Sequence, residues 1–231
     1  FGDLLDNVFV AMGNDGHAAA ALMLSVGLLA ACSSSSSNET NTGSEETAIS
    51  SMPEIEGITY YGDVPENPEK VVNFAYSYTG YLLQLGVDVS SYSLDLEKDS
   101  PAFGDQLEDA VQLTSDDTEA IAEQEPDLII IFAGTDNIDQ LKEIAPVIEI
   151  TYGQADYLQM LTDLGQIFGK EEEADAWLDA WDEKVTSAQK ELSGTISTDT
   201  TFTIMDFFDK NITIYGDNFG RGGELIYDSL G

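Results

Sequence analysis

The chain has very little of three residue types that build reactive or metal-binding sites: one cysteine, one histidine and one arginine in 231 residues. A single cysteine excludes an intrachain disulfide and a thiolate metal cluster. Cys32 and His17 both precede the part with a domain-like composition, so a zinc, copper or haem-type site and a histidine-activated nucleophile are not expected there. We therefore expect no catalytic residues, no resident cofactor and no metal held directly by histidine or cysteine; any metal must arrive inside another molecule or be held by oxygen ligands.

Positive charge is the second scarcity. The chain carries 44 acidic residues against eight lysines and arginines, a formal net charge of −36. Nucleic-acid binding needs clustered basic side chains against phosphates, so this class of partner is excluded. The hydrophobic content of 42% is nevertheless high enough for a real core. The composition indicates a folded domain with a strongly hydrated, acidic surface.

The first thirty-odd residues have the pattern of an export signal. An apolar run from Ala18 to Ala31 is short for a bilayer span but has the length of a signal-peptide core. Its last residues with Cys32, "LAAC", resemble the bacterial lipobox, whose cysteine receives a diacylglycerol. No lysine or arginine precedes this run, which makes the start of the signal atypical. The alternative is a buried apolar helix that ends at an inert cysteine.

The next segment, Ser33 to Thr47, consists mostly of serine, threonine, asparagine and glutamate. It has almost nothing to bury, so we interpret it as a flexible tether between a lipid anchor and a domain.

From Ile58 onward, β-branched runs alternate with amphipathic stretches, as in α/β domains. The strongest strand predictions are Lys70–Ala75, Pro126–Phe132 and Ala145–Ile150, and the second is apolar enough to be buried on both faces. Helices are predicted at 114–124 and 137–144, each opened by residues that can cap free amides.

The second half of the chain predicts two successive helices, at 155–168 and 171–192, then a strand pair and a short helix at 222–230. The second helix is long enough to join two lobes. Only about forty residues follow it, fewer than a lobe with its own core needs. The expected fold is therefore α/β and two-lobed, with the lobes joined by a long helix and the second lobe incomplete.

These patterns divide the chain into five predicted parts. They are a signal peptide (1–31), a lipidated cysteine with its tether (32–54), an N-terminal α/β lobe (55–168), an interlobe helix (169–194) and the start of a C-terminal α/β lobe (195–231).

Several motifs from Pro65 to Gly231 resemble one family, the hydroxamate-siderophore-binding lipoproteins that feed Gram-positive iron ABC importers. The matching segments are "NPEKVV", "EQEPDLIII", "APVIEI", "GKEEEADAWLDAW" and, most specifically, "YGDNFGRGGE". The resemblance implies a monomer, lipid-anchored at the extracellular face of the cell membrane. It implies that an Fe(III) siderophore binds between the lobes without being chemically changed, and that ferric iron enters only as that complex. The implied partners are a permease with its ATPase, and Glu119 matches the acidic residue that docks on the permease.

The resemblance also implies the ligand-binding residues. Arg221 falls on the arginine that hydrogen-bonds the iron-bound hydroxamate oxygens, and Phe219 stands where tryptophan is usual. The aromatic positions of the first lobe fall on Tyr78, Phe132 and Tyr152. Phe132 stands where a relative has tyrosine, and Phe219 lacks the indole donor, so the preferred siderophore can differ.

The chemistry of the residues agrees with this site. A ferric hydroxamate presents partly negative oxygens on a greasy body, which calls for aromatic walls and one or two strong donors. The rigid fork of a guanidinium meets this need better than a lysine. The alternative is that Arg221 only caps a turn or pairs with Glu224. A phosphate cradle formed by the neighbouring glycines is disfavoured because the spacing fits no phosphate-loop motif.

Two other functional interpretations stay open. The ligand can instead be haem, cobalamin or a catecholate siderophore, although a catecholate complex carries more negative charge and favours several basic residues. A surface adhesin or structural lipoprotein would account for the anchor and tether but not for an aromatic set with a single arginine. An adhesin would not respond to a ferric hydroxamate, whereas a receptor would.

Overall fold

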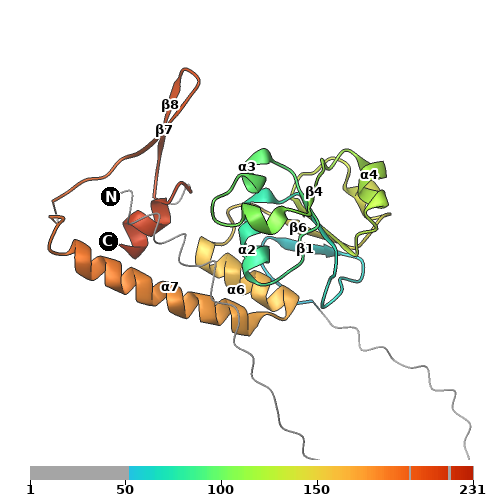
Figure 1. The fold of residues 1–231 in the computed structure, drawn as a ribbon, viewed down its shortest axis with the longest axis horizontal. Helices are drawn as coiled ribbons and strands as arrows, with labels where there is room; N and C mark the ends of the chain where they lie inside the picture. Colours follow the sequence, from blue (N-terminus) through green and yellow to red (C-terminus); the bar gives the residue numbers. More distant parts are fainter. Residues whose placement is uncertain (1–51, 198, 218–219, 231) are drawn as a thin grey trace, which may run out of the picture.

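The computed structural model describes residues 52–197, 199–217 and 220–230 (Figure 1). Four predicted features lie outside the described residues: the signal peptide, the lipidation site Cys32, nearly all of the tether and the ligand-binding residue Phe219. The described part comprises an α/β lobe and a long helix that leads away from it to a β-hairpin and a last short helix. The predicted α/β class is confirmed.

A four-stranded sheet forms the centre of the lobe, in the order β1-β6-β5-β2. Strands β2 (Val71–Asn73), β5 (Leu128–Phe132) and β6 (Val147–Ile150) are parallel, and β1 (Ile58–Tyr61) pairs antiparallel with β6 at one edge. Residues 128–131 of β5 are all buried, as the continuous apolar run predicts for a strand covered on both faces. The three strands predicted most strongly are thus confirmed, each slightly shorter than its sequence pattern.

A second, two-stranded sheet continues beyond β2. Strands β3 (Ser91–Tyr92) and β4 (Val111–Gln112) are parallel, and an isolated bridge between Val71 and Val89 links them to the main sheet. Short helical segments fill the connections of the lobe: η1 (Tyr76–Tyr78), α2 (Thr79–Gln84), α3 (Asp95–Lys98), η2 (Gly104–Leu107), α4 (Thr118–Glu123) and α5 (Ile138–Leu141).

Helices cover both faces of the sheet. On one face Ile130 packs with Leu82 of α2 and with the apolar side of α6 (Tyr157–Phe168). On the other face Ile129 packs with Ile121 of α4 and Leu141 of α5. Successive residues of β5 therefore contribute to two separate cores, as the alternation of side chains along a strand requires.

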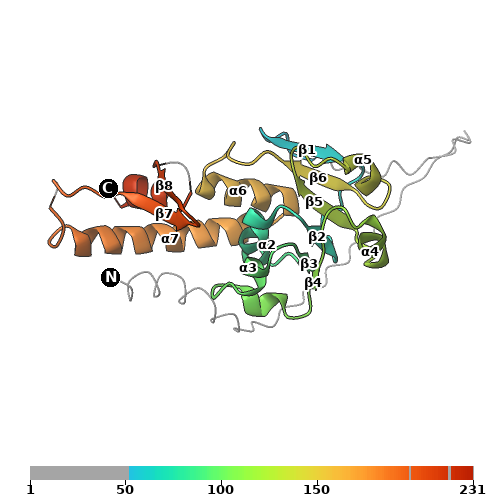
Figure 2. The same cartoon turned by 90° about the horizontal axis from the view of Figure 1, so that it is seen from above.

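Helix α6 begins and ends at clear signals. The Asp156 carboxylate accepts hydrogen bonds from the backbone N–H groups of Leu158 and Gln159, at 2.9 and 2.8 Å. Gly169, with φ of +60°, ends the helix in the left-handed conformation. Helix α7 (Glu171–Leu192) follows at once and has the bounds that the sequence predicts. The two helices run side by side (Figure 2), so closely that a Cβ on Gly165 would lie 2.9 Å from that of Ala174.

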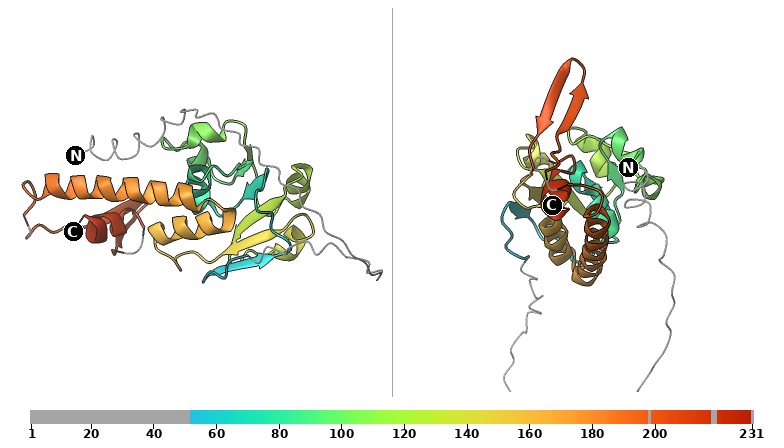
Figure 3. Two further views of the ribbon diagram at one scale, coloured as in Figure 1. Left: turned by 90° about the horizontal axis from the view of Figure 1, so that it is seen from below. Right: turned by 90° about the vertical axis from the view of Figure 1, so that its left-hand side faces the viewer.

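Beyond Ala174 no residue of α7 is fully buried, although Trp177 and Leu178 still pack against the core of the lobe. It leads to the hairpin of β7 (Ile204–Phe208) and β8 (Asn211–Tyr215) and to the π-helix η3 (Glu224–Ser229), as Figure 3 shows from two sides. The predicted strand pair is confirmed. The predicted last helix is present, in π rather than α geometry. None of the helices in the described part is long and apolar enough to cross a membrane.

The last segment folds back onto the lobe. The hydroxyl groups of Tyr157 and Ser229 lie 2.8 Å apart, and Gln189 of α7 donates to the Ser229 carbonyl oxygen at 2.7 Å. These contacts hold η3 against the start of α6 and the far part of α7. They place the preceding loop, which carries Arg221, next to the strand ends of the lobe.

Candidate functional site

An aromatic cluster lies where the three parallel strands end. Parallel strands place their carboxyl ends at one edge of a sheet, which is where ligands bind in open α/β folds. Tyr78 follows β2, Phe132 ends β5 and Tyr152 follows β6. The ring centroids lie 5.8 Å apart for Tyr78 and Phe132, 6.0 Å for Phe132 and Tyr152, and 6.4 Å for Tyr78 and Tyr152. The structure thus brings together the three aromatic residues that the sequence singled out on this lobe.

Two more tyrosines belong to this cluster and were missed by the sequence analysis. Tyr76 meets the Phe132 ring edge-on at 5.2 Å, and Tyr81 meets Tyr78 at 6.0 Å. Tyr76 is 43% exposed and Tyr152 is 64% exposed, whereas Tyr78 is only 6% exposed. Tyr76 and Tyr152 therefore offer open ring surface, and the buried Tyr78 contacts the rings of Phe132 and Tyr152. The signal was in the sequence: all three tyrosines near β2 stand in the stretch "YSYTGY".

Burial raises the pKa of two tyrosines of this cluster, Tyr78 and Tyr81. Burial, with a smaller contribution from Tyr152, raises the pKa of Tyr78 to about 12, while a backbone hydrogen bond at Gly153 opposes the shift. The pKa of Tyr81 is also raised, first by burial and then by Tyr78 and Glu224. Neutral phenols can still donate hydrogen bonds to ligand oxygens, so the cluster combines apolar surface with donors.

An alkaline titration tests this environment. The folded-state pKa of Tyr78 lies above the ordinary value of 10.0. Its neutral form therefore stabilises the fold below pH 10, and this contribution is lost as pH rises toward about 12. In ultraviolet titrations of the folded protein, Tyr78→Phe should remove a late-ionising phenol. Burial and the charge of Asp163 raise the pKa of Tyr60 to about 12. Tyr60→Phe should therefore also remove a late-ionising phenol. If Tyr78→Phe instead removes a phenol that ionises near the ordinary pKa of 10.0, Tyr78 is not buried as described.

The loop that carries Arg221 has an unusual backbone. Gly220, Arg221 and Gly222 have consecutive positive φ angles of 69°, 55° and 79°. A non-glycine residue in this region costs on the order of 1 kcal/mol. In the same loop, a Cβ on Gly223 would overlap the carbonyl oxygen of Asp217, so glycine is required for the turn. Strain of this kind is typical of functional loops.

The guanidinium of Arg221 lies on the hairpin. Its Nη2 is 3.8 Å from Oδ2 of Asp206, and its Cζ lies 5.3 Å from the centroid of the Tyr215 ring. The partner in the ion pair is thus Asp206, not the Glu224 that the alternative interpretation named. The side chain is 61% exposed, and 3.8 Å is too long for a hydrogen bond. Its donors therefore remain available to a ligand.

The loop and the aromatic cluster meet at one point. A Cβ on Gly220 would lie 3.9 Å from the hydroxyl oxygen of Tyr152. Gly220 therefore borders the aromatic cluster, and Arg221 follows it directly in the chain. The guanidinium of Arg221, however, turns toward the hairpin. Phe219, the other predicted residue of this loop, lies outside the described residues.

Glu119 lies away from this cluster, in the first turn of α4. It is exposed, and the carboxylate of Asp117 caps the helix by accepting from the Ala120 N–H at 3.1 Å. In Figure 1, α4 lies at the side of the lobe opposite α7. The Glu119 carboxylate is therefore not part of the candidate ligand site.

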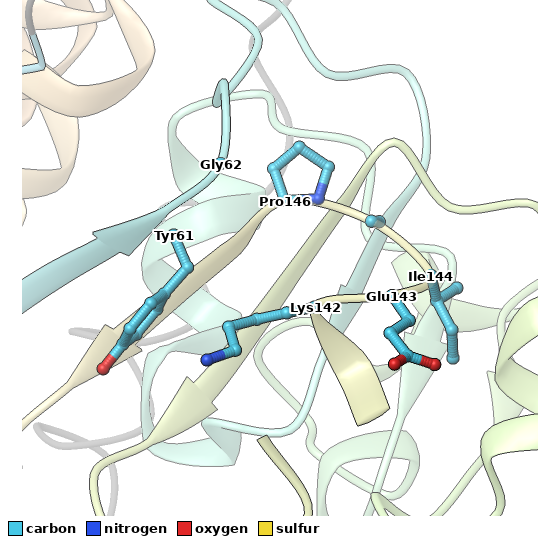
Figure 4. A pocket seen from close by; sticks show the side chains of 7 residues that line it. Tyr61, Gly62, Lys142, Glu143, Ile144 and Pro146 are labelled. Carbon is cyan, nitrogen blue, oxygen red and sulfur yellow. The ribbon is translucent and has the colours of Figure 1, made fainter. Parts of the chain in front are cut away.

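A separate surface pocket of about 330 Å³ lies at the other edge of the sheet, between the end of β1 and the start of β6 (Figure 4). Lys142 at its mouth pairs with Asp139 at 2.7 Å and lies 4.9 Å from the centroid of the Tyr61 ring. This pair lowers the pKa of Asp139 and raises that of Lys142. The lysine is thus already engaged, and none of the predicted ligand-binding residues lines the pocket.

The family follows from comparison with known proteins. Residues 71–231 match the periplasmic binding protein family, and the chain belongs to this family. No group of three or more histidine, cysteine, aspartate or glutamate residues in the described ranges is arranged to hold a metal ion. The fold is thus that of a periplasmic binding protein, with an aromatic cluster where the parallel strands end.

Within this family, the chain is similar to proteins named for iron(3+)-hydroxamate binding. It is 31% identical over 218 residues to the iron(3+)-hydroxamate-binding protein FhuD of Bacillus subtilis, a match that covers 90% of this chain and 66% of that protein. The structure of FhuD from S. pseudintermedius matches with a TM-score of 0.67 and 34% identity, over 73% of this chain and 60% of that one. FhuD2 of Staphylococcus aureus with bound ferrioxamine B matches with a TM-score of 0.65 and 32% identity, over 71% and 63%. The chain thus spans less than two thirds of these relatives' length.

Proposed function

We propose that this protein captures an Fe(III) hydroxamate siderophore outside the cell and delivers it to an ABC importer, without changing the ligand chemically. The observation that carries the proposal is the convergence of Tyr78, Phe132 and Tyr152 at the carboxyl edge of the sheet, with the Arg221 loop against Tyr152. The similarity to proteins named for iron(3+)-hydroxamate binding, and to one with bound ferrioxamine B, supports it.

The site suits this class of ligand. The exposed rings of Tyr76 and Tyr152, with Phe132 between them, provide the apolar wall for a compact siderophore body. The guanidinium of Arg221 supplies charge-assisted donors for the iron-bound oxygens. With a net charge of −36, the chain disfavours a highly anionic complex, which argues for a hydroxamate over a catecholate. Phe219 would add a further apolar surface from the same loop.

The proposal extends to location and partners. A diacylglycerol on Cys32 would anchor the protein to the outer face of the cell membrane, with the polar tract as its tether. A monomer would present the loaded lobe to the permease, and Glu119 would dock on it. Ferric iron would enter only inside the siderophore complex, with no cofactor of the protein's own.

Intrinsic fluorescence tests the proposed ligand. Trp177 and Trp181 stack at 5.3 Å on α7, and Trp181 meets Tyr157 at 6.1 Å, near the contact of η3 with the lobe. Ferrioxamine, ferrichrome, a ferric catecholate and haem should be titrated in parallel, on this chain and on a version extended by a relative's C-terminal segment. Saturable quenching by a hydroxamate is expected. A preference for haem or the catecholate would identify another ligand, and no response in either version would favour an adhesin or structural lipoprotein.

Substitution of Glu119 separates docking from binding. Glu119→Ala should leave the siderophore affinity unchanged, because the side chain is exposed on α4 and apart from the aromatic cluster. Uptake of radioactive iron by cells should fall severalfold, since a charged contact at a rim mainly changes association with a partner. Glu123→Ala, at the exposed end of the same helix, is the matched control. A loss of affinity in Glu119→Ala would mean that the residue belongs to the ligand site.

A further inference from the structure

Three polar side chains are fully buried beneath the aromatic cluster and take no part in the proposed ligand contacts. Asn73 ends β2, Thr79 begins α2 and Glu97 lies in α3, and each is 0% exposed. A polar group that is buried without a hydrogen-bond partner destabilises the fold, so buried polar groups are kept where their hydrogen bonds are made.

These side chains form one chain of hydrogen bonds. The Asn73 amide nitrogen donates to the Thr79 hydroxyl at 2.8 Å, and this hydroxyl donates to Oε1 of Glu97 at 2.5 Å. The other carboxylate oxygen, Oε2, accepts from the backbone N–H groups of Ser93 and Leu94, at 2.9 and 2.8 Å. Among the described residues no ion pair involves Glu97, so its three hydrogen-bond donors replace a cation.

The chain of hydrogen bonds holds the turn that carries the exposed tyrosine. Oδ1 of Asn73 accepts from the Ala75 N–H at 3.0 Å, and the Ala75 carbonyl oxygen accepts from the Tyr78 N–H at 2.8 Å. The turn from Ala75 to Tyr78 is therefore fixed at its start by Asn73 and at its end by Thr79. The rings of Tyr76 and Tyr78 project from this short span, so their position depends on both ends.

We propose that the Asn73–Thr79–Glu97 network is a positioning device that holds Tyr76 and Tyr78 in the pose that receives the ligand. This inference deepens the proposed function and rests on it. Glu97 touches no ligand. It acts through Thr79, whose hydroxyl needs an acceptor because it already accepts from Asn73.

Glu97→Gln breaks one bond of the network without changing its shape. The glutamine oxygen must face the two backbone N–H groups, which leaves its NH₂ group facing the Thr79 hydroxyl. That hydroxyl then meets two donors and has no acceptor for its own proton. The double variant Asn73→Asp with Glu97→Gln reverses the polarity: the new carboxylate on β2 accepts from Thr79, and Thr79 accepts from the new amide on α3. The double variant should therefore restore both bonds of Thr79, while it loses the weaker donation from the Asn73 amide to the Ala75 carbonyl oxygen at 3.4 Å.

Hydrogen exchange of the full chain tests the device without any ligand. In Glu97→Gln, amides 75 to 81 should exchange about tenfold faster than in the parent, the loss expected for one hydrogen bond. The double variant should return most of the way to the parent rate, because it lacks only the weaker bond to Ala75. Ile121→Val is the control, since it perturbs the core on the other face of the sheet and should leave these amides unchanged. Thr79→Val should reproduce the effect, and Thr79→Ser, which keeps the hydroxyl, should not.

Ferrioxamine B affinity is the second readout. Glu97→Gln and Thr79→Val should bind about tenfold more weakly than the parent, and Thr79→Ser and the double variant should recover. Faster exchange without weaker binding would overturn the positioning role, and unchanged exchange in both Glu97→Gln and Thr79→Val would overturn the network itself. If the parent chain binds no hydroxamate, the proposed function fails, while hydrogen exchange still decides whether the network fixes the turn.

Discussion

Arg221→Ala is expected to weaken binding of a ferric hydroxamate by about 1.5–3 kcal/mol, the range for a hydrogen bond to a charged group. The structure supports this size of effect because the guanidinium is 61% exposed and its contact with Asp206 is too long to occupy its donors. The same side chain contributes little to the fold, since exposed ion pairs stabilise weakly. The dissociation constant should therefore change while the unfolding midpoint stays close to that of the parent.

Two companion variants separate the guanidinium from the backbone of its loop. Arg221→Gly accepts the φ of 55° without strain, so it should lose affinity as alanine does, but with a relaxed loop. Arg221→Lys keeps the charge and loses the planar fork, and should fall between parent and alanine. An alanine variant with the parent's dissociation constant would remove the arginine from the site.

Phe168→Ala should lower the free energy of unfolding by about 3–5 kcal/mol, the usual cost of deleting a buried ring. Phe168 is 1% exposed and belongs to the core that α6 forms with the sheet. It is also the last residue of α6 before the Gly169 turn into α7, so a cavity there loosens the base of the long helix. Urea unfolding followed by circular dichroism measures the change.

Phe168→Leu retains most of the volume and should cost much less than alanine. Ile214, on the hairpin, is 69% exposed, so Ile214→Ala should leave the unfolding midpoint nearly unchanged. A loss below about 1 kcal/mol in Phe168→Ala would mean that the ring is not a core anchor.

Local patterns explain which elements the sequence predicted well. The unbroken apolar run of β5 predicted a strand covered on both faces. The helix α7 was predicted between Gly169 and Gly194, two glycines that flank its amphipathic pattern. The strands β1, β3 and β4 were not predicted. β3 and β4 are two residues long, and β1 is stabilised by pairing with β6, far along the chain. Such pairing leaves little trace in a local pattern.

The sequence predicted which residues belong to the candidate site better than it predicted how they contact one another. Motif resemblance indicated Tyr78, Phe132 and Tyr152, and the topology of parallel strands explains why they meet. The openness of Tyr76, the burial of Tyr78 and the pairing of Arg221 with Asp206 depend on how distant segments pack. These features needed the structure, because no spacing along the chain encodes them.

Calorimetric titration with ferrioxamine B and with the same siderophore free of iron tests the central claim most directly. The site is proposed to recognise hydroxamate oxygens that are gathered around Fe(III) on a compact body. We predict saturable binding of the ferric complex and at least about tenfold weaker binding of the iron-free form, a difference of about 1.4 kcal/mol. Equal affinity for both forms, or heat from neither, would contradict the claim that this chain forms part of a ferric hydroxamate receptor.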